Sequence, residues 1–435
     1  MQQNPFTFGN PVRDHRRFFG RREEIRQVVN RLLSSAHEST SIVGERRIGK
    51  TSLVKHLADA QVAASLGLTP DRFCLIYIDF QGLTDITPQR FWQRVLSKMA
   101  RTICVPDLVP EIEAVQKMPH FDLFDLEDLC ERIAKTNLTT VLLLDEFEYV
   151  TQNANFGADF FGGLRALAIH HNLPLVTATR RELIDLCHSA ELKGSPFFNI
   201  FANVVLRPFT HADALEMISA YLVETELDFT PQELEWVLRL GGGHPFFVQV
   251  AGYYLVEARQ KGLASEELQE HLTSNFDQQA DPHFTYLWAH CSESEKITLL
   301  AILSLTNQVT SKKVQSTLEN IVKIHARARL DIPELIKRGL LLTEGTGGQA
   351  QFRLLSTSLV RWIAREIVAA PGSEESKSSV EEWLHAGGKD VVDPVKGALP
   401  RFKKKYWPMV STILQELSFE LTGAALFQIL TKAVF

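Results

Sequence analysis

The chain has 435 residues, of which 45% are hydrophobic and 23% charged, as expected for a globular protein of about two to four domains. A net charge of −6 argues against a chain that mainly binds nucleic acid, although it leaves room for local basic patches. The five cysteines are scattered and include no C-x-x-C pair, so neither zinc nor disulfides are expected. We see no basic and apolar leader and no apolar run of membrane length, which favours a cytoplasmic protein.

The first segment, residues 1–15, is expected to be an extended arm, because Asn4–Val12 is rich in proline and glycine. The stretch Arg16–Ile25, R-R-F-F-G-R-R-E-E-I, then leads into a helix that reaches Leu33. From its residues alone, this stretch is the start of an amphipathic helix with a solvated Arg/Glu face. We expect it to open the first folded domain, residues 16–209.

A phosphate-binding loop is the most specific feature of the chain. Ser41–Leu53 contains G-x-x-x-x-G-K-T, with Gly44, Gly49, Lys50 and Thr51 at the fixed positions. A strand ending before the loop and a helix beginning at its lysine present backbone N–H groups and a positive dipole end to a polyphosphate. Lys50 adds a charge for the β- and γ-phosphates, and the Thr51 hydroxyl can ligate Mg²⁺. The nucleotide-binding residues expected from the loop are Gly44, Glu45, Arg46, Arg47, Ile48, Gly49, Lys50, Thr51 and Ser52.

Two apolar runs end in acidic residues, as buried parallel strands do at a ligand-binding sheet edge. Phe73–Phe80 carries Asp79 at its end, and Thr140–Glu148 reads T-V-L-L-L-D-E-F-E, the Walker B pattern. Asp145 is expected to hold Mg²⁺, and Glu146 to orient or deprotonate the attacking water. Buried strands often end in acidic residues, so the pattern indicates a nucleotide site only together with the phosphate-binding loop upstream.

A further buried strand is predicted at Leu173–Arg180, L-P-L-V-T-A-T-R. Arg180 would stand at the carboxyl edge of the sheet, where α/β proteins bind ligands. An arginine at a strand end is often only an exposed charge, and Arg181 is the alternative candidate for a role at the site.

Two helical domains are expected beyond the sheet. Residues 210–285 form a helical lid, in which Gly241–Gly243 breaks one helix and Pro245 restarts the next. Residues 286–368 are typical of a winged helix with a hairpin at its end. The turn, Gly345–Gln351, carries no lysine or arginine, which favours a role within the protein over DNA reading.

The C-terminal part differs in composition from the rest. Residues 369–379 form a linker rich in Ser and Glu, and residues 380–435 are expected to be a helical tail. Basic and aromatic residues at Arg401–Trp407 precede a largely apolar segment, Pro408–Phe435. This pattern suits contact with a membrane surface, docking onto the protein itself or contact with an oligomer partner.

The order of these motifs over about residues 16–368 resembles that of STAND-type NTPases, which are related to AAA+ ATPases, close to the archaeal-ATPase-like branch. The resemblance implies an α/β P-loop NTPase with a parallel sheet flanked by helices, followed by the lid, winged helix and tail. The stretch Arg16–Ile25 resembles the N-terminal box that precedes the P-loop in that family. There, the box and the proline of a G-x-P motif contact the base, and the arginine at the strand end senses the γ-phosphate. The base contacts implied are Phe19, Gly20, Arg21 and Pro245. The catalytic residues implied are Lys50, Asp145, Glu146 and Arg180.

Family members also carry a His-Asp pair just after the wing, the hairpin of the winged helix. Leu355-Ser356-Thr357 stands at that place here, so an identical lock on ADP is not expected.

The function expected is a slowly hydrolysing ATPase switch that binds ATP or ADP with Mg²⁺. It would couple nucleotide state to domain rearrangement and to oligomerisation or release of the tail, in signalling or antiviral defence. Its partner would be another copy of the chain or a signalling or effector protein. Two alternatives are a DNA-acting AAA+ initiator or loader and a membrane-perturbing effector gated by the ATPase.

Overall fold

In the computed structural model, the chain divides into two compact units. The sheet unit comprises residues 9–206, and the helical unit comprises residues 1–8 and 207–435. The structure describes residues 3–189, 193–223, 225, 227–306, 315–347 and 350–368. The predicted linker and tail, residues 369–379 and 380–435, therefore lie outside the described residues. Within the described part, no helix is both long and apolar enough to cross a membrane.

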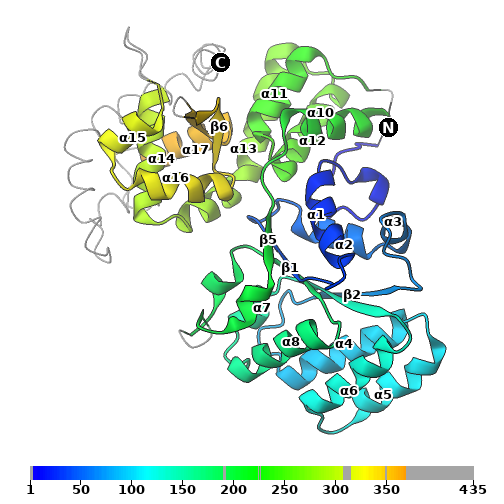
Figure 1. Ribbon diagram of the computed structural model, residues 1–435. Coiled ribbons are helices and arrows are strands. Elements are labelled where there is room, and N and C mark those ends of the chain that lie inside the picture. The colour runs from blue at the N-terminus through cyan, green and yellow to red at the C-terminus, as the bar shows by residue number, and fades with distance from the viewer. Residues whose placement is uncertain are drawn as a thin grey trace. The chain divides into compact units, whose positions relative to one another are not determined.

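A parallel sheet of five strands organises the sheet unit (Figure 1), which confirms the predicted fold class. The strands run in the spatial order β2-β3-β4-β1-β5. Their bounds are β1 Thr40–Val43, β2 Phe73–Asp79, β3 Thr139–Asp145, β4 Leu175–Thr179 and β5 Ala202–Val205. Because all the pairings are parallel, the carboxyl ends of the strands meet at one edge.

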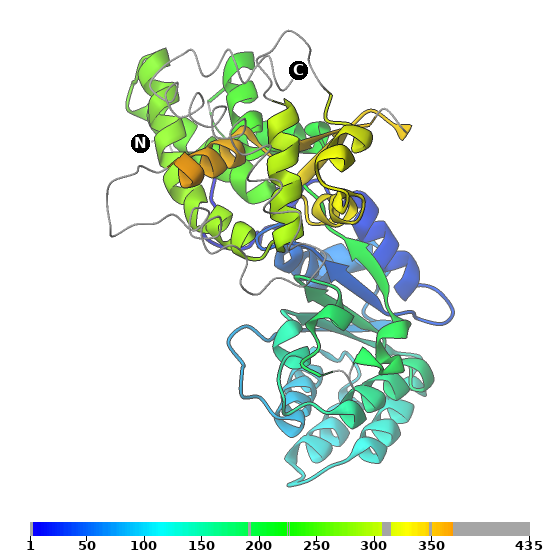
Figure 2. The ribbon, with the colours of Figure 1, turned by 90° about the vertical axis from the view of Figure 1, so that its left-hand side faces the viewer.

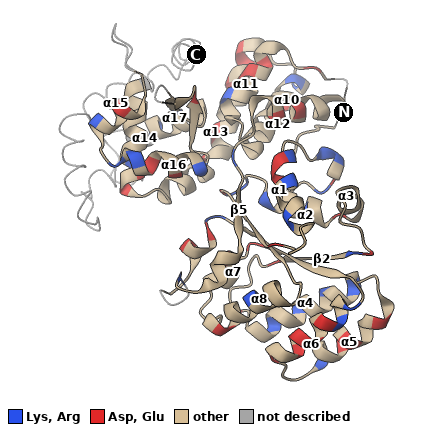
Figure 3. Cartoon of the chain, in the orientation of Figure 1, with Lys and Arg blue, Asp and Glu red and all other residues tan. Residues whose placement is uncertain are grey.

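Helices cover both faces of this sheet (Figures 1 and 2). One face packs on α1 (Arg22–Leu32), α2 (Lys50–Ala58) and α3 (Ala60–Ser65). The other packs on α4 (Pro88–Thr102), α5 (Val109–Lys117), α6 (Leu123–Ala134), α7 (Glu148–Thr151) and α8 (Ala158–His170). Short 3₁₀ turns lie at η1 (His15–Arg17), η2 (Pro106–Leu108), η3 (Leu183–Leu186) and η4 (Pro196–Ile200). Figure 3 shows acidic and basic residues mixed along α5 and α6.

Strand β3 lies at the centre of both cores because all seven of its residues are buried. Leu142 and Leu144 point to the α4–α8 face, whereas Val141 and Leu143 point to the α1–α3 face, as the two-residue period of a strand requires. A strand buried on both faces needs an unbroken apolar run, which is why the sequence shows no alternation there.

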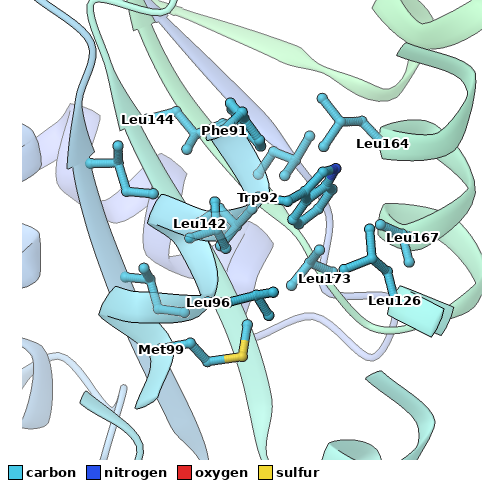
Figure 4. Packing of buried hydrophobic residues seen from close by; sticks show 14 of the residues in the cluster. Phe91, Trp92, Leu96, Met99, Leu126, Leu142, Leu144, Leu164, Leu167 and Leu173 are labelled. Carbon is cyan, nitrogen blue, oxygen red and sulfur yellow. The ribbon is translucent and has the colours of Figure 1, made fainter. Parts of the chain in front are cut away.

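Helix α4 illustrates how the core on the α4–α8 face of the sheet is filled (Figure 4). Thr87 caps its first turn by accepting a hydrogen bond from Arg90 N–H, and Pro88 stands at the first helical position. Phe91 and Met99 lie on its buried face, where a large-to-small change costs about 2–5 kcal/mol. Packing of this stripe fixes the helix beneath the strands that carry the site.

The helical unit contains ten elements beyond residue 206 within the described residues. They are α10 (His211–Val223), α11 (Pro231–Gly241), α12 (Pro245–Gln260), α13 (Ser265–Ala289), α14 (Glu293–Thr306), α15 (Leu318–Ile324), α16 (Ala328–Lys337), β6 (Leu341–Glu344), β7 (Gln351–Leu354) and α17 (Thr357–Val368). Strands β6 and β7 form an antiparallel hairpin.

The first residues of the chain belong to this helical unit. Phe6 is fully buried, and its ring lies 5.4 Å from that of Tyr221 and 5.9 Å from that of Phe229. The amide of Asn4 donates to the carbonyl of Tyr253 at 2.9 Å. The chain therefore passes between the two units twice, at Phe8–Gly9 and at Leu206–Arg207.

The turn between α11 and α12 packs tightly on the start of α17. Gly242 has a φ of 57°, and a Cβ added there would overlap the carbonyl oxygen of Leu355. The Ser358 hydroxyl donates to the carbonyl of Leu240 at 3.2 Å. Glycine is required because this turn needs both a left-handed conformation and close approach of another backbone.

Candidate nucleotide-binding site

The phosphate-binding loop joins β1 to α2, as its sequence predicts. Gly44 N–H donates to the carbonyl of Thr179 at 3.1 Å, and Gly49, with a φ of 106°, stands just before the first helical residue, Lys50. The Lys50 ammonium is buried and donates to the carbonyls of Gly44 at 2.8 Å and Glu45 at 3.2 Å. The lysine thus holds the loop in a closed turn around its own charge.

Two arginines extend the positive charge of the loop. Arg46 and Arg47 are exposed, and Arg47 has a φ of 63°, in the left-handed region that a side chain rarely adopts. Partial burial and the charge of Arg46 lower the pKa of Arg47. Such adjacent cations attract an anionic ligand to the loop.

The two predicted Mg²⁺ ligands meet at the carboxyl edge of the sheet. Asp145 is fully buried at the end of β3, its carboxylate accepts a hydrogen bond from Tyr77 Oη at 3.1 Å, and the Thr51 hydroxyl acts to lower its pKa. Burial raises the pKa of Asp145, against which these hydrogen bonds and the charge of Lys50 act. A hydroxyl and a carboxylate beside the phosphate loop are the oxygen donors that Mg²⁺ prefers, so the residues fit this cation.

Glu146, the predicted catalytic carboxylate, has an unusual backbone. Its φ is 53°, and its N–H donates to Oδ1 of Asp145 at 3.1 Å. Non-glycine residues in this region cost about 1–3 kcal/mol, and such strain gathers at functional sites. Burial, followed by the charge of Glu148, raises the pKa of Glu146 to about 7.

The arginine predicted at the end of β4 is ion-paired with a buried glutamate. Arg180 Nε donates to Oε1 of Glu148 at 2.8 Å, and Glu148 is 1% exposed. The alternative arginine, Arg181, approaches Oε1 of Glu45 at 3.8 Å. Sequence reasoning missed Glu148 as a site residue; the only signal was the second glutamate of D-E-F-E.

The N-terminal box supports the loop from outside. Arg21 is 4% exposed and donates through NH2 to the carbonyl of Ile48 and through NH1 to Glu24, both at 3.0 Å. It therefore braces the backbone of the phosphate loop. Phe19 and Gly20 are half-buried next to it, and their contact with a base stays a prediction.

Two further contacts are predicted, at Ser52 and Pro245. Ser52, on α2, accepts a hydrogen bond from the backbone N–H of Val12 at 3.1 Å. Pro245 is buried as the first residue of α12 and belongs to the helical unit, so its contact with the nucleotide stays a prediction.

The sheet order, the phosphate loop and the Asp-Glu pair at one edge define a P-loop NTPase of the STAND and AAA+ kind. Residues 21–308 match the family described as Novel STAND NTPase 2. The chain belongs to this family.

Solved structures with the same fold include the Walker-type ATPase of Pyrococcus abyssi. That structure is 17% identical, with a TM-score of 0.50, over 82% of this chain and 98% of the other. The ORC2 protein of Aeropyrum pernix, in ADPNP–ADP complexes, is 17% identical with a TM-score of 0.48, over 83% and 96% of the two chains. The ORC1 protein of the same organism, in complex with DNA, is 15% identical with a TM-score of 0.41, over 80% and 93%. No curated protein matches the sequence significantly.

Proposed function

We propose that the protein is a slowly hydrolysing ATPase switch, in which ATP and ADP favour different arrangements of its units. The observation that carries the proposal is the meeting of Lys50, Thr51, Asp145, Glu146 and Arg180 at one sheet edge in a member of a STAND NTPase family. A P-loop lysine, a buried acid with a hydroxyl partner and a second carboxylate are the parts that nucleotide hydrolysis needs.

The chemistry follows from where these groups lie. Lys50 would exchange its bonds to the loop carbonyls for the phosphates, and Thr51 with Asp145 would hold Mg²⁺, which neutralises phosphate charge. Glu146 would orient the attacking water and accept its proton. Arg180 would stabilise the charge that develops on the γ-phosphate.

The resting contacts support slow turnover. Lys50 is bonded to the carbonyls of its own loop, and Arg180 is bonded to Glu148. A nucleotide must therefore compete with contacts already made, and a site of this kind suits a switch better than rapid metabolism.

The expected parts of the switch beyond the sheet unit are proposals. Residues 210–285 would act as the lid and residues 286–368 as a winged helix, with Pro245 packing on the base. The tail, residues 380–435, would be released for contact with another copy of the chain or with a signalling or defence effector. We propose the cytoplasm as the working compartment.

A role in reading DNA finds less support. The arginine on the β6–β7 hairpin, Arg353, is ion-paired with Glu344 on the neighbouring strand, so its charge is already neutralised. The proposed membrane-perturbing role rests on the tail alone.

Phosphate release by the purified full-length chain tests the proposal. With ATP and Mg²⁺ we expect slow hydrolysis that Glu146→Gln abolishes, and parallel assays with GTP establish the preferred base. A chain that neither binds nor hydrolyses either nucleotide would contradict the proposal.

A further inference from the structure

Strand β4 places Arg180 between the two halves of the nucleotide site. Because β4 pairs with both β1 and β3, its end is tied to each of them. The carbonyl of Thr179 accepts from Gly44 N–H, and the carbonyl of Ala178 accepts from Phe147 N–H, both at 3.1 Å. Arg180 is the next residue and so leaves the sheet between the phosphate loop and the segment that follows Asp145.

The position of the Arg180 side chain is set by Glu148. This glutamate opens α7 and is 1% exposed, and its Oε1 accepts from Arg180 Nε at 2.8 Å. A buried carboxylate is costly unless a cation compensates it. The ion pair therefore resists separation and restricts the guanidinium to this part of the edge.

The second oxygen of Glu148 gives an independent signal. Oε2 is buried and accepts no hydrogen bond from any described residue. Buried polar atoms are nearly always satisfied, and exceptions gather at functional sites. Glu148 opens α7 two residues after Glu146, so this oxygen belongs to the segment that follows Asp145 and carries the proposed catalytic carboxylate.

The neighbouring arginine makes a longer contact with Glu45 than Arg180 makes with Glu148. Arg181 and Arg180 are similarly exposed, at 27% and 32%, but Arg181 approaches Glu45 only at 3.8 Å.

We propose that Glu148 is a positioning residue that holds Arg180 for recognition of the γ-phosphate, so that the pair lets the site distinguish ATP from ADP. The inference rests on the proposed ATP- and ADP-binding function of the site. A guanidinium held through Nε is oriented before the ligand arrives, and less side-chain freedom is lost when the phosphate binds.

The test measures the ratio of the ADP Kd to the Kd of a non-hydrolysable ATP analogue, by calorimetry on the full-length chain with Mg²⁺. In Glu148→Gln and in Arg180→Gln we expect the ratio to fall by about tenfold, the scale of a charge-assisted hydrogen bond. In the double variant the ratio should fall no further than in either single variant, because the two residues act as a unit. Arg180→Lys should restore part of the preference.

A purely structural ion pair would behave differently. It would lower the melting temperature and weaken both nucleotides equally, leaving the ratio unchanged, and that result in a folded Glu148→Gln protein overturns the inference. If Glu148→Gln does not fold, a wild-type ratio in Arg180→Gln overturns it equally.

Two further variants separate the possible failures. Arg132 bonds Glu111 through Nε at 2.9 Å on the α5–α6 surface, so Arg132→Gln removes a matched ion pair and should leave the ratio unchanged. Lys50→Ala tests the nucleotide site itself. If Lys50→Ala loses binding but Glu148→Gln keeps the wild-type ratio, only the role of Glu148 is wrong.

Discussion

The ammonium of Lys50 lies 2.8 Å from the carbonyl oxygen of Gly44, within its own phosphate-binding loop. Lys50 is only 5% exposed, and its ammonium would leave the backbone carbonyls of the loop when a polyphosphate binds. Lys50 therefore both attracts a polyphosphate and stabilises the conformation of its own loop.

Replacement of this lysine should abolish nucleotide binding. In Lys50→Ala, we expect the Kd for ATP to rise by at least about 100-fold, because a desolvated charge contact to phosphate is worth several kcal/mol. Calorimetry provides the measurement. Lys117→Ala, which removes an exposed lysine paired with Glu113, should bind normally. Unchanged ATP affinity in Lys50→Ala would show that the site is elsewhere.

Loss of the Glu146 carboxylate should separate binding from hydrolysis. In Glu146→Gln, the ATP affinity should stay within about threefold, whereas the single-turnover rate should fall by about 10²–10⁴-fold, the contribution of a general base. Calorimetry measures the affinity, and single-turnover phosphate release measures the rate. A variant that hydrolyses ATP at the wild-type rate would exclude Glu146 from the reaction.

The hydroxyl of Thr51 should determine how strongly Mg²⁺ supports binding. Thr51→Ala removes the oxygen that meets Asp145, and we expect about tenfold more Mg²⁺ to reach half-maximal ATP binding. Thr51→Ser keeps the hydroxyl and serves as the matched control. Equal Mg²⁺ dependence in Thr51→Ala and the wild type would remove Thr51 from the metal site.

The glycine turn of the helical unit offers a stability test with an internal control. Gly242→Ala introduces both a left-handed alanine and overlap with the Leu355 carbonyl, so the free energy of unfolding should drop by more than about 2 kcal/mol. Gly262 has a similar φ of 68°, but among the described residues nothing lies within 4 Å of its added Cβ. Gly262→Ala should therefore cost only about 1 kcal/mol, the strain alone. Equal losses in denaturant titrations would contradict the close packing at Gly242.

Acid should weaken the helical unit through Asp331. Burial raises the pKa of this carboxyl, but hydrogen bonds from His325, Ser294 and Thr298 outweigh it, and the net pKa is lowered. A lowered folded-state pKa gives stability that is present above the unfolded value, about 3.9, and is lost as the pH falls towards the folded one. In urea titrations from pH 7 to pH 3, the free energy of unfolding should fall less steeply in Asp331→Asn than in the wild type. An identical pH dependence in the two proteins would remove Asp331 as its source.

The local parts of the site could be predicted because their physics is local. The phosphate loop needs its glycines and lysine at fixed spacing, and the acid at the end of β3 follows directly from a buried apolar run. The family and the fold class inferred from these motifs are confirmed.

The long-range parts could not be predicted from spacing. Nothing in the local sequence places β4 between β1 and β3, and the Arg180–Glu148 pair depends on that order. The base contact implied for Arg21 stays a prediction, and the sequence shows no sign of the hydrogen bond from its guanidinium to the loop carbonyl of Ile48. The sequence predicts an extended arm around Phe6, but it does not reveal that this ring is buried near Tyr221 in the helical unit.

In the proposed switch, nucleotide state controls assembly of the protein. Light scattering coupled to size-exclusion chromatography should be run on the full-length chain without nucleotide, with ADP and with ATP and Mg²⁺, alongside Glu146→Gln. We expect a larger species with ATP, most populated in Glu146→Gln, and the smaller species with ADP. A single mass in every state, with ATP binding intact and sensitive to Lys50→Ala, would contradict an assembly switch.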